Sequence, residues 1–376
     1  MRNALLGLAV ADIDIATTNL PEETVRRTEA AGFKTAPTGI DHGTITAIFD
    51  GTPYEITTLR DDVETDGRRA TVAFGRDWKR DAERRDFTVN ALYAEADGRV
   101  VDLVGGVADI KSRTLRFIGS AEDRIREDYL RILRFFRFFA WYGAGRPDAE
   151  GLRACARLKD GLASLSAERV WSELKKTLSA PDPTRALLWM RQAGVLTAIL
   201  PESEKWGIDA IHGLVAAEAA LDWPADPLLR LEAITPPDSA RMKALAARLK
   251  LSSKEAERLE NWAGSAPAKP DTTDSALRTA LYYGAAQGIA DRLRLALASA
   301  RAAAENDDAQ LHAAAGFARQ LKIADGWAKP TFPVKGTDLL ERGAIAGPQL
   351  GSALAEIERR WVESGFTLSR DALLAE

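Results

Sequence analysis

Two aspartates near the start of the chain are spaced for metal chemistry. Asp12 and Asp14 lie two positions apart in ADIDIAT, residues 11–17, whose apolar and β-branched composition is typical of a strand. Successive side chains of a strand point to opposite faces, so both carboxylates project from the same face. Two like charges so close repel each other unless a cation lies between them, and Mg²⁺ is a natural partner for carboxylate oxygens. The alternative for an isolated pair is a solvated strand edge.

A third carboxylate, Glu55, belongs to YEITTLR, residues 54–60, which is also typical of a strand. If this strand is a neighbour of the first, Glu55 is a candidate third metal ligand beside Asp12 and Asp14. A surface ion pair between Glu55 and Arg60 is the alternative.

The segment ERRDFTVNALY, residues 83–93, combines groups that suit a nucleotide. Two adjacent arginines, Arg84 and Arg85, can bind phosphate oxygens through paired hydrogen bonds. Asp86 and Asn90 can hydrogen-bond ribose hydroxyls. The alternative is a helix start with a charged first turn.

A long helical pattern, SAEDRIREDYLRILRFFRFFAWYG, ends at Gly143. Glu127 and Asp128 lie four and three positions before Arg131, which places all three side chains on one helix face. Intrahelical ion pairs are one interpretation. The other is that Asp128 and Arg131 together present acceptors and donors in one plane, as the edge of a nucleobase does.

The same region is locally basic and rich in phenylalanine. Residues 111–137 hold eight Lys or Arg and four Asp or Glu, which predicts a phosphate-binding face in a chain whose net charge is −4. Four phenylalanines lie on the other face, and we expect them to be core rather than a base-stacking platform: Phe135, Phe136, Phe138 and Phe139.

The elements that must position these residues change in character along the chain. Short strands are expected at 11–17, 43–49, 54–60 and 98–104, and helices at 3–8 and 21–32, the second with Pro21 in its first turn and Gly32 at its end. Residues 61–82 are highly charged without a clear period, so we expect a long loop. Beyond residue 111 the pattern is helical throughout. The first part is therefore α/β or α+β, and the remainder all-α.

Composition limits the class of protein. A chain of 376 residues predicts more than one domain, and its single cysteine excludes an internal disulfide framework and fits a reducing compartment. Three scattered histidines leave no Cys/His zinc constellation. With no apolar run of about 18 residues and no signal-peptide pattern, we expect a cytoplasmic protein without a membrane partner.

The order of these segments resembles one family, the class II tRNA nucleotidyltransferases, which comprise the bacterial and eukaryotic CCA-adding enzymes and bacterial poly(A) polymerases. The resemblance is colinear over residues 2 to about 178, with a weaker one over 336–366. Its segments are RNALLG, DIDIAT, HGTITAI, YEITTLR, RRDFTVNAL, VDLVGGVADI, EDYLRILRFFRF and LSAERVWSEL.

The resemblance implies an α+β fold with a DNA polymerase beta-type nucleotidyltransferase head over residues 1–112. This head would hold a mixed sheet that lacks its first strand. A helical neck at 113–178, a helical body at 179–250 and an RNA-binding helical tail at 251–376 would follow. It further implies that Asp12 and Asp14 are catalytic and hold Mg²⁺.

The resemblance also assigns nucleotide-binding residues. Asp128 and Arg131 would read the Watson–Crick edge of CTP or ATP, Arg134 would brace them, and the segment with Glu168 and Arg169 would support their helix. Ribose and phosphates would be held by Arg84, Arg85, Asp86 and Asn90. The partners implied are tRNA, or another RNA 3′ end, with CTP and ATP, while the sequence does not indicate the oligomeric state.

Two glycines in VDLVGGVADI, Gly105 and Gly106, form either a hinge between head and neck or a plain tight turn.

The start of this chain departs from the family's first motif, which reads Gly-Gly-x-Val-Arg followed by Asp or Asn. The chain has only the end of that motif, with Arg2 as the nucleotide-binding residue and Met1 where valine is expected. We therefore expect the first residue to be internal to a longer protein. In a chain this short, triphosphate binding would be weak.

Three functions remain open. The first is CCA addition to tRNA, which the intact segment 61–82 favours. The second is poly(A) addition, or partial CC or A addition, because these enzymes share the same motifs. The third is a non-catalytic RNA-binding relative that has lost the Gly-Gly motif, although retention of Asp12, Asp14, Asp128 and Arg131 argues against it.

Overall fold

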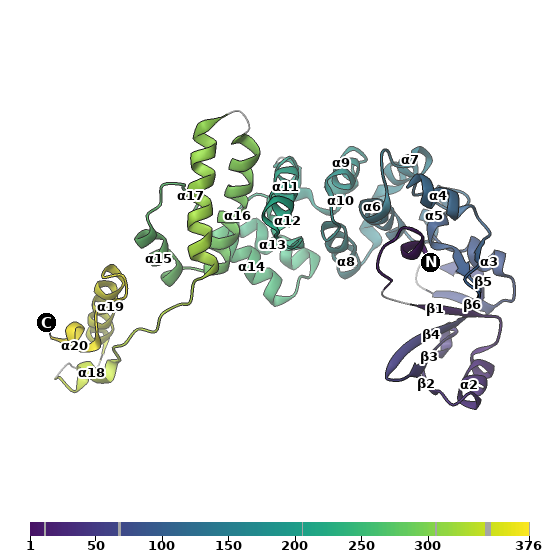
Figure 1. The fold of residues 1–376 in the computed structure, drawn as a ribbon, viewed down its shortest axis with the longest axis horizontal. Helices are drawn as coiled ribbons and strands as arrows, with labels where there is room; N and C mark the ends of the chain where they lie inside the picture. The colour runs from purple at the N-terminus through teal and green to yellow at the C-terminus, as the bar shows by residue number, and fades with distance from the viewer. Residues whose placement is uncertain (11–12, 67–68, 205, 305–306, 343–346, 376) are drawn as a thin grey trace. The chain divides into compact units, whose positions relative to one another are not determined.

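The computed structural model describes residues 1–10, 13–66, 69–204, 206–304, 307–342 and 347–375, with the backbone alone over 61–66 and 69–73 (Figure 1). Contacts divide the chain into two compact units, Met1–Pro201 and Glu202–Glu376, and each is described by itself. Within the described residues, all strands lie in the first unit and no helix is long and apolar enough to cross a membrane.

The first unit is built on a mixed four-stranded sheet in the order β1-β4-β3-β2. Strand β1 pairs in parallel with β4, while β4 with β3 and β3 with β2 are antiparallel. The strands span Asp14–Thr17 (β1), Lys34–Gly39 (β2), Thr44–Phe49 (β3) and Thr52–Thr58 (β4). Strand β1 is an edge of this sheet.

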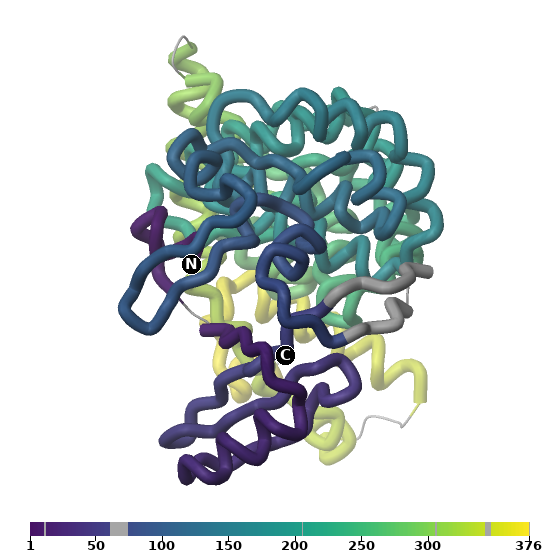
Figure 2. Tube along the Cα trace, turned by 90° about the vertical axis from the view of Figure 1, so that its right-hand side faces the viewer, coloured from purple at the N-terminus to yellow at the C-terminus, as the bar shows by residue number. Residues whose placement is uncertain are grey.

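Helix α2, Pro21–Ala30, packs against β2, β3 and β4, as both ribbon and tube show (Figure 1 and Figure 2). Proline stands in its first turn with Glu22 and Glu23, where the helix dipole favours acidic side chains. The chain leaves the helix through Gly32, whose φ of +87° is in the left-handed region. The predicted start and end of this helix are confirmed.

The prediction of a loop at 61–82 is wrong. An antiparallel hairpin occupies Arg60–Asp66 (β5) and Arg69–Phe74 (β6), and helix α3 follows at Trp78–Glu83. The segments RDDVETD and RATVAF contain the β-branched residues valine and threonine, which favour strands. The high charge concealed this signal. Asp77 begins α3 by accepting hydrogen bonds from the N–H groups of Lys79 and Arg80.

The predicted helix ending at Gly143 is broken in two. Helix α5 covers Ala121–Glu127 and helix α6 covers Leu130–Tyr142, with Gly143 as its C-cap. Asp128 between them is extended, with φ −154° and ψ 107°. Its carboxylate accepts the Leu130 N–H at 3.0 Å, and this local bond starts the second helix. Asp128 and Arg131 therefore do not share one continuous helix.

The remaining elements of the first unit surround a phenylalanine-rich core. Phe87, Phe117 and Phe135 pack ring to ring, and the four phenylalanines predicted as core are all buried. Two short strands and six further α-helices lie in the described part of the unit: α1 (Arg2–Leu5), β7 (Leu92–Ala94), β8 (Val100–Asp102), α4 (Gly106–Ser112), α7 (Ala149–Leu158), α8 (Ala167–Leu178), α9 (Thr184–Gln192) and α10 (Val195–Ile199).

The second unit is helical throughout its described residues, as predicted. Its helices are α11 (Ala210–Leu221), α12 (Pro227–Ala233), α13 (Ser239–Leu249), α14 (Ser253–Gly264), α15 (Asp274–Tyr283), α16 (Ala286–Ala303), α17 (Asp308–Asp325), α18 (Gly336–Leu340), α19 (Pro348–Glu363) and α20 (Arg370–Leu374). A Ser252–Glu255 capping box begins α14.

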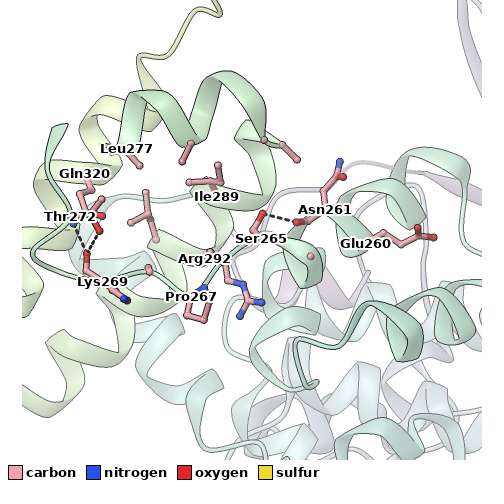
Figure 3. Close-up of a pocket in the computed structure, with 17 residues that line it drawn as sticks. Glu260, Asn261, Ser265, Pro267, Lys269, Thr272, Leu277, Ile289, Arg292 and Gln320 are labelled. Carbon is pink, nitrogen blue, oxygen red and sulfur yellow. Dashed lines mark hydrogen bonds between the residues drawn. The ribbon is translucent and has the colours of Figure 1, made fainter. Parts of the chain in front are cut away.

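A cavity of about 460 Å³ lies among α14, α15, α16 and α17 (Figure 3). Arg292 donates from Nε and Nη2 to the carbonyls of Trp262 and Ala263 at 2.9 and 3.0 Å, which caps the end of α14. Gln320 donates to the carbonyls of Lys269 and Pro270. These bonds hold the segment between α14 and α15 against α16 and α17.

Buried charges also connect the helices of this unit. Arg258 donates from Nε to Asp291 at 2.8 Å and from Nη2 to Asp226 at 2.6 Å. Glu232 is 1% exposed, and neither of its carboxylate oxygens has a hydrogen-bond partner among the described residues. Its closest guanidinium, that of Arg258, is 4.0 Å away. Burial, together with the charge of Asp291, raises the pKa of Glu232 well above its ordinary value.

Candidate active site

The exposed face of the four-stranded sheet carries two of the predicted metal ligands. The parallel register pairs Asp14 of β1 with Glu55 of β4, so the two exposed side chains lie next to each other on one face. The antiparallel register places Thr46 of β3 beside Glu55 on that face. Ile45 lies on the opposite face and is fully buried. The strand neighbour predicted for Glu55 is thus confirmed. Asp12 lies outside the described residues.

The donor chemistry of this face suits a magnesium ion. Within the described ranges, the carboxylate of neither Asp14 nor Glu55 has an ion-pair or hydrogen-bond partner, so the alternative pair between Glu55 and Arg60 is not formed. Those ranges contain no group of three or more Asp, Glu, His or Cys placed to hold a metal. Mg²⁺ retains water and substrate phosphates among its ligands, so a pair of protein carboxylates fits it.

Asp86 is the centre of the predicted nucleotide segment. It is buried, and its Oδ1 accepts the side-chain amide of Asn90 at 3.0 Å and the Phe87 N–H at 2.9 Å. Its Oδ2 accepts the Arg134 Nε at 2.7 Å from helix α6. The structure therefore brings three predicted residues, Asp86, Asn90 and Arg134, into one network that connects the head segment to the following helix.

Arg2 joins the same network from the start of the chain. Its Nη1 donates to the Asn90 side-chain oxygen, and its Nη2 donates to the Tyr142 hydroxyl at 2.9 Å. The guanidinium lies 4.0 Å from the centre of the Tyr142 ring and 5.0 Å from that of Phe138. Burial lowers the pKa of Arg2, although Tyr142 and Asp86 act in the opposite direction. A partly desolvated cation of this kind favours an anionic ligand.

Sequence reasoning missed the aromatic and acidic partners of these arginines. The centre of the Phe138 ring also lies 5.3 Å from the guanidinium of Arg134 and 4.3 Å from that of Arg137. The Nε of Arg137 forms an ion pair with the buried Glu173 carboxylate at 2.8 Å. Arg134, Phe138 and Tyr142 recur every four residues on α6, and this spacing was the available signal.

Arg84 and Arg85 turn to a different carboxylate. Both bind Asp81 of helix α3, Arg84 from Nε and Nη2 at 2.9 and 2.7 Å and Arg85 from Nη2 at 3.2 Å. Arg85 also donates from Nη1 to the Asn90 carbonyl at 3.1 Å, which keeps the pair next to the Asp86 network. Their contact with a nucleotide stays a prediction.

The side chains of Asp128 and Arg131 are paired with other residues. Arg131 donates from Nη1 to Glu127 and to the Arg124 carbonyl. Asp128 accepts the Arg169 Nη2 at 2.6 Å, so the segment predicted to support this region does contact it. Reading of a base edge by Asp128 and Arg131 stays a prediction.

The Gly-Gly turn is tightly bonded. Asp102 accepts four backbone N–H groups, those of residues 104 to 107, at 2.9–3.2 Å. Burial acts to raise the pKa of Asp102, but these four bonds hold it below its ordinary value. Gly105 has φ +85°, and a Cβ at Gly106 would overlap the Thr88 carbonyl. Both glycines are thus explained by the turn itself.

The fold and site together define a nucleotidyltransferase with a poly(A) polymerase-type head. The family model described as "Poly A polymerase head domain" matches residues 1–116, and that described as "Probable RNA and SrmB- binding site of polymerase A" matches residues 147–206.

Curated relatives are more specific. CCA tRNA nucleotidyltransferase 1, mitochondrial, of Mus musculus is 34% identical over 379 residues, covering 100% of this chain and 84% of its own. The CCA-adding enzyme of Streptococcus pyogenes is 43% identical over 226 residues, 59% of this chain and 52% of its own. This chain belongs to the CCA tRNA nucleotidyltransferase family.

Solved structures agree with this assignment. The Bacillus stearothermophilus CCA-adding enzyme in complex with CTP matches with a TM-score of 0.72 and 28% identity, over 97% of this chain and 87% of that one. The Thermotoga maritima CCA-adding enzyme complexed with tRNA_CCA matches in fold, with a TM-score of 0.61 and 18% identity over 100% of this chain and 88% of that one. The predicted α+β head followed by helical regions is confirmed.

Proposed function

We propose that this chain adds the CCA terminus to the 3′ end of tRNA, using CTP and ATP and no nucleic-acid template. The observation that carries the proposal is the similarity to the mitochondrial CCA tRNA nucleotidyltransferase along the whole chain. The acidic sheet face and the arginine network both lie within the first compact unit, which supports one site for metal and nucleotide.

Asp14 and Asp12 would hold Mg²⁺, with Glu55 as a further oxygen ligand. Magnesium bound there would polarise the α-phosphate and make the RNA 3′-hydroxyl more acidic. The side chains of the protein would position the nucleotide. Arg2, half-buried and bound to neutral partners, is available to a phosphate, and the Asp86–Asn90 pair offers hydrogen-bonding groups to a ribose.

Selection between CTP and ATP would depend on Asp128 and Arg131. Asp128 lies at the break between α5 and α6, where the Arg169 contact fixes its carboxylate. Arg131 follows in the first turn of α6, held by Glu127. An acceptor and a donor at a helix break, each held by a separate partner, can present a fixed edge to a base.

We propose the division into head 1–112, neck 113–178, body 179–250 and tail 251–376 as the working organisation. The boundary between the compact units, after Pro201, falls inside the proposed body. A cytoplasmic location stays a prediction, because the mouse relative is named as mitochondrial.

The test is nucleotide incorporation into a tRNA that lacks its terminal CCA, with Mg²⁺ and with CTP and ATP offered singly and together. We expect two C residues, then one A, then termination. A run of A would replace the proposal with poly(A) addition, and a stop after CC would indicate a partial enzyme. No incorporation despite tRNA binding would support a non-catalytic relative.

A further inference from the structure

Asp81 is a buried carboxylate that the proposed function does not use. It lies on α3 with 1% of its surface exposed. Its Oδ1 accepts Nε and Nη2 of Arg84 and also the backbone N–H of Arg60 at 3.2 Å. Its Oδ2 accepts the Tyr93 hydroxyl at 2.6 Å and Nη2 of Arg85 at 3.2 Å. Both oxygens of one buried group are thus saturated by donors from three segments.

The charge of Asp81 is maintained by these contacts. Burial alone would raise the pKa of the Asp81 carboxyl, but the hydrogen bond from Tyr93 and the charges of Arg84 and Arg85 hold it below its ordinary value. The carboxylate therefore remains ionised at neutral pH and can orient two guanidinium groups.

The contacts leave part of each arginine available. Arg84 is 23% exposed, and its Nη1 has no partner within the described residues. Arg85 is 35% exposed, and its guanidinium lies 5.2 Å from the centre of the Tyr93 ring. Asp81 thus binds one side of Arg84 and leaves a donor at the surface, the geometry needed to present a guanidinium to a phosphate.

Asp81 also reaches the base of the β5–β6 hairpin. Arg60 is the first residue of β5, and its N–H is the donor to Asp81. Leu59 directly precedes β5 and Gly75 directly follows β6. The Gly75 N–H donates to the Leu59 carbonyl at 2.8 Å, and this bond closes the base of the hairpin. One carboxylate therefore connects the hairpin base to the two arginines.

We infer that Asp81 is a positioning residue for the incoming nucleotide: it fixes Arg84 and Arg85 relative to each other and to the base of the β5–β6 hairpin. The inference deepens the proposed function and rests on it, because the arginines act on the triphosphate only if the chain binds CTP and ATP. Asp81 would act through these arginines, because both of its oxygens already accept hydrogen bonds from the protein.

The first test compares Asp81→Asn with Asp77→Asn. Asparagine keeps the shape at both positions and removes the charge. Asp77 is the exposed N-cap of the same helix, its carboxylate accepts the backbone N–H groups of Lys79 and Arg80, and asparagine is itself a good N-cap. We expect Asp81→Asn to raise KM for CTP and ATP by about tenfold, the loss expected for a charge-assisted hydrogen bond. Asp77→Asn should leave KM unchanged.

The split between KM and kcat separates positioning from a folding defect. A smaller folded fraction lowers the apparent kcat and leaves KM as it was. An unchanged KM in Asp81→Asn, or an equal rise in Asp77→Asn, would overturn the inference. Tyr93→Phe removes one bond to Asp81 while keeping the ring, and we expect a smaller rise in KM than for Asp81→Asn.

A double-mutant cycle tests the route of the effect. If Asp81 acts through Arg84, Asp81→Asn raises KM much less in an Arg84→Ala background than in the wild type. Full additivity of the two changes contradicts the inference. The wild-type chain separates this failure from that of the proposed function. If the wild type incorporates neither CTP nor ATP, the proposed function is rejected. If the wild type is active and Asp81→Asn has the same KM, only the role of Asp81 is rejected.

Discussion

Asp86 and Arg134 form an ion pair across 48 positions of sequence, with Nε and Nη2 of Arg134 at 2.7 and 2.5 Å from Oδ2 of Asp86. Asp86 precedes the short turn that carries Asn90, and Arg134 belongs to helix α6. The pair therefore connects the segment proposed to hold the ribose with the helix that follows the proposed base-reading residues.

Breaking this pair from either side should have the same consequence. We expect Asp86→Asn and Arg134→Gln each to raise KM for both nucleotides, and the double variant to be less impaired than the sum of the two. Tm and KM, measured by thermal unfolding and steady-state kinetics on wild type, the two single variants and the double variant, complete this double-mutant cycle. Arg126→Gln, an exposed arginine of α5 that pairs with Glu122, is the control. Simple additivity would mean that the two residues act independently.

The acidic sheet face should be required for transfer and not for RNA binding. Asp14→Ala should reduce nucleotide incorporation to background while tRNA binding, measured by filter retention, stays within twofold. Asp50→Asn, in the exposed turn between β3 and β4, is the control, since asparagine accepts its φ of +47°. Substantial incorporation by Asp14→Ala would remove the metal assignment.

Base selection is testable apart from overall rate. Arg131→Ala removes the donor of the proposed base-reading pair, so incorrect nucleotides should be incorporated more often relative to correct ones. The measurement is single-nucleotide incorporation with each of the four NTPs. Arg126→Ala serves as the matched substitution on the preceding helix. A preserved preference among NTPs would show that Arg131 does not read the base.

Glycine substitutions should separate the tight turn from open positions. Gly106→Ala forces a Cβ into the Thr88 carbonyl, and we expect a loss of about 1–3 kcal/mol in the free energy of unfolding. Gly351→Ala, within α19 and with open space around it, should be neutral or stabilise by about 0.5–1 kcal/mol. Urea unfolding of both variants checks the contrast. Equal stability of the two would refute the packing role of Gly106.

Glu232 should make the second unit less stable as pH rises. Its pKa is raised above 4.5 in the folded chain, so the folded state holds a proton that the unfolded state has released. Stability is then lost from about pH 4.5 upward until the folded-state pKa is passed. Glu232→Gln removes this loss, and its gain in Tm over wild type should grow as the pH rises above about 4.5. A pH-independent difference would contradict the protonated state.

Local signals predicted much of the fold. Pro21 and Gly32 mark the ends of α2, and Asp14 lies on a strand beside the strand of Glu55, as expected. The phenylalanine face of α6 is core because its periodicity matches the helix. Each of these depends on neighbours within a few positions, which a single sequence displays.

What could not be predicted depends on distant partners. The hairpin at 60–74 depends on pairing between two strands, and the many charged residues of this segment hid its strand pattern. The break at Asp128 depends on a side chain that also pairs with Arg169, 41 positions away. The bond from Arg2 to Tyr142 spans 140 positions. The contacts that Asp81 makes with Tyr93, and Arg2 with Tyr142, exist only because the fold brings distant segments together.

The Asp102 turn has a mechanical consequence. Four backbone N–H groups depend on one carboxylate, so the bonds cannot be lost one at a time through independent side chains. Replacement of that single side chain, as in Asp102→Ala, would remove all four hydrogen bonds of the turn between β8 and α4 together. The turn between β8 and α4 is therefore stabilised as one unit by a single side chain rather than by several independent contacts.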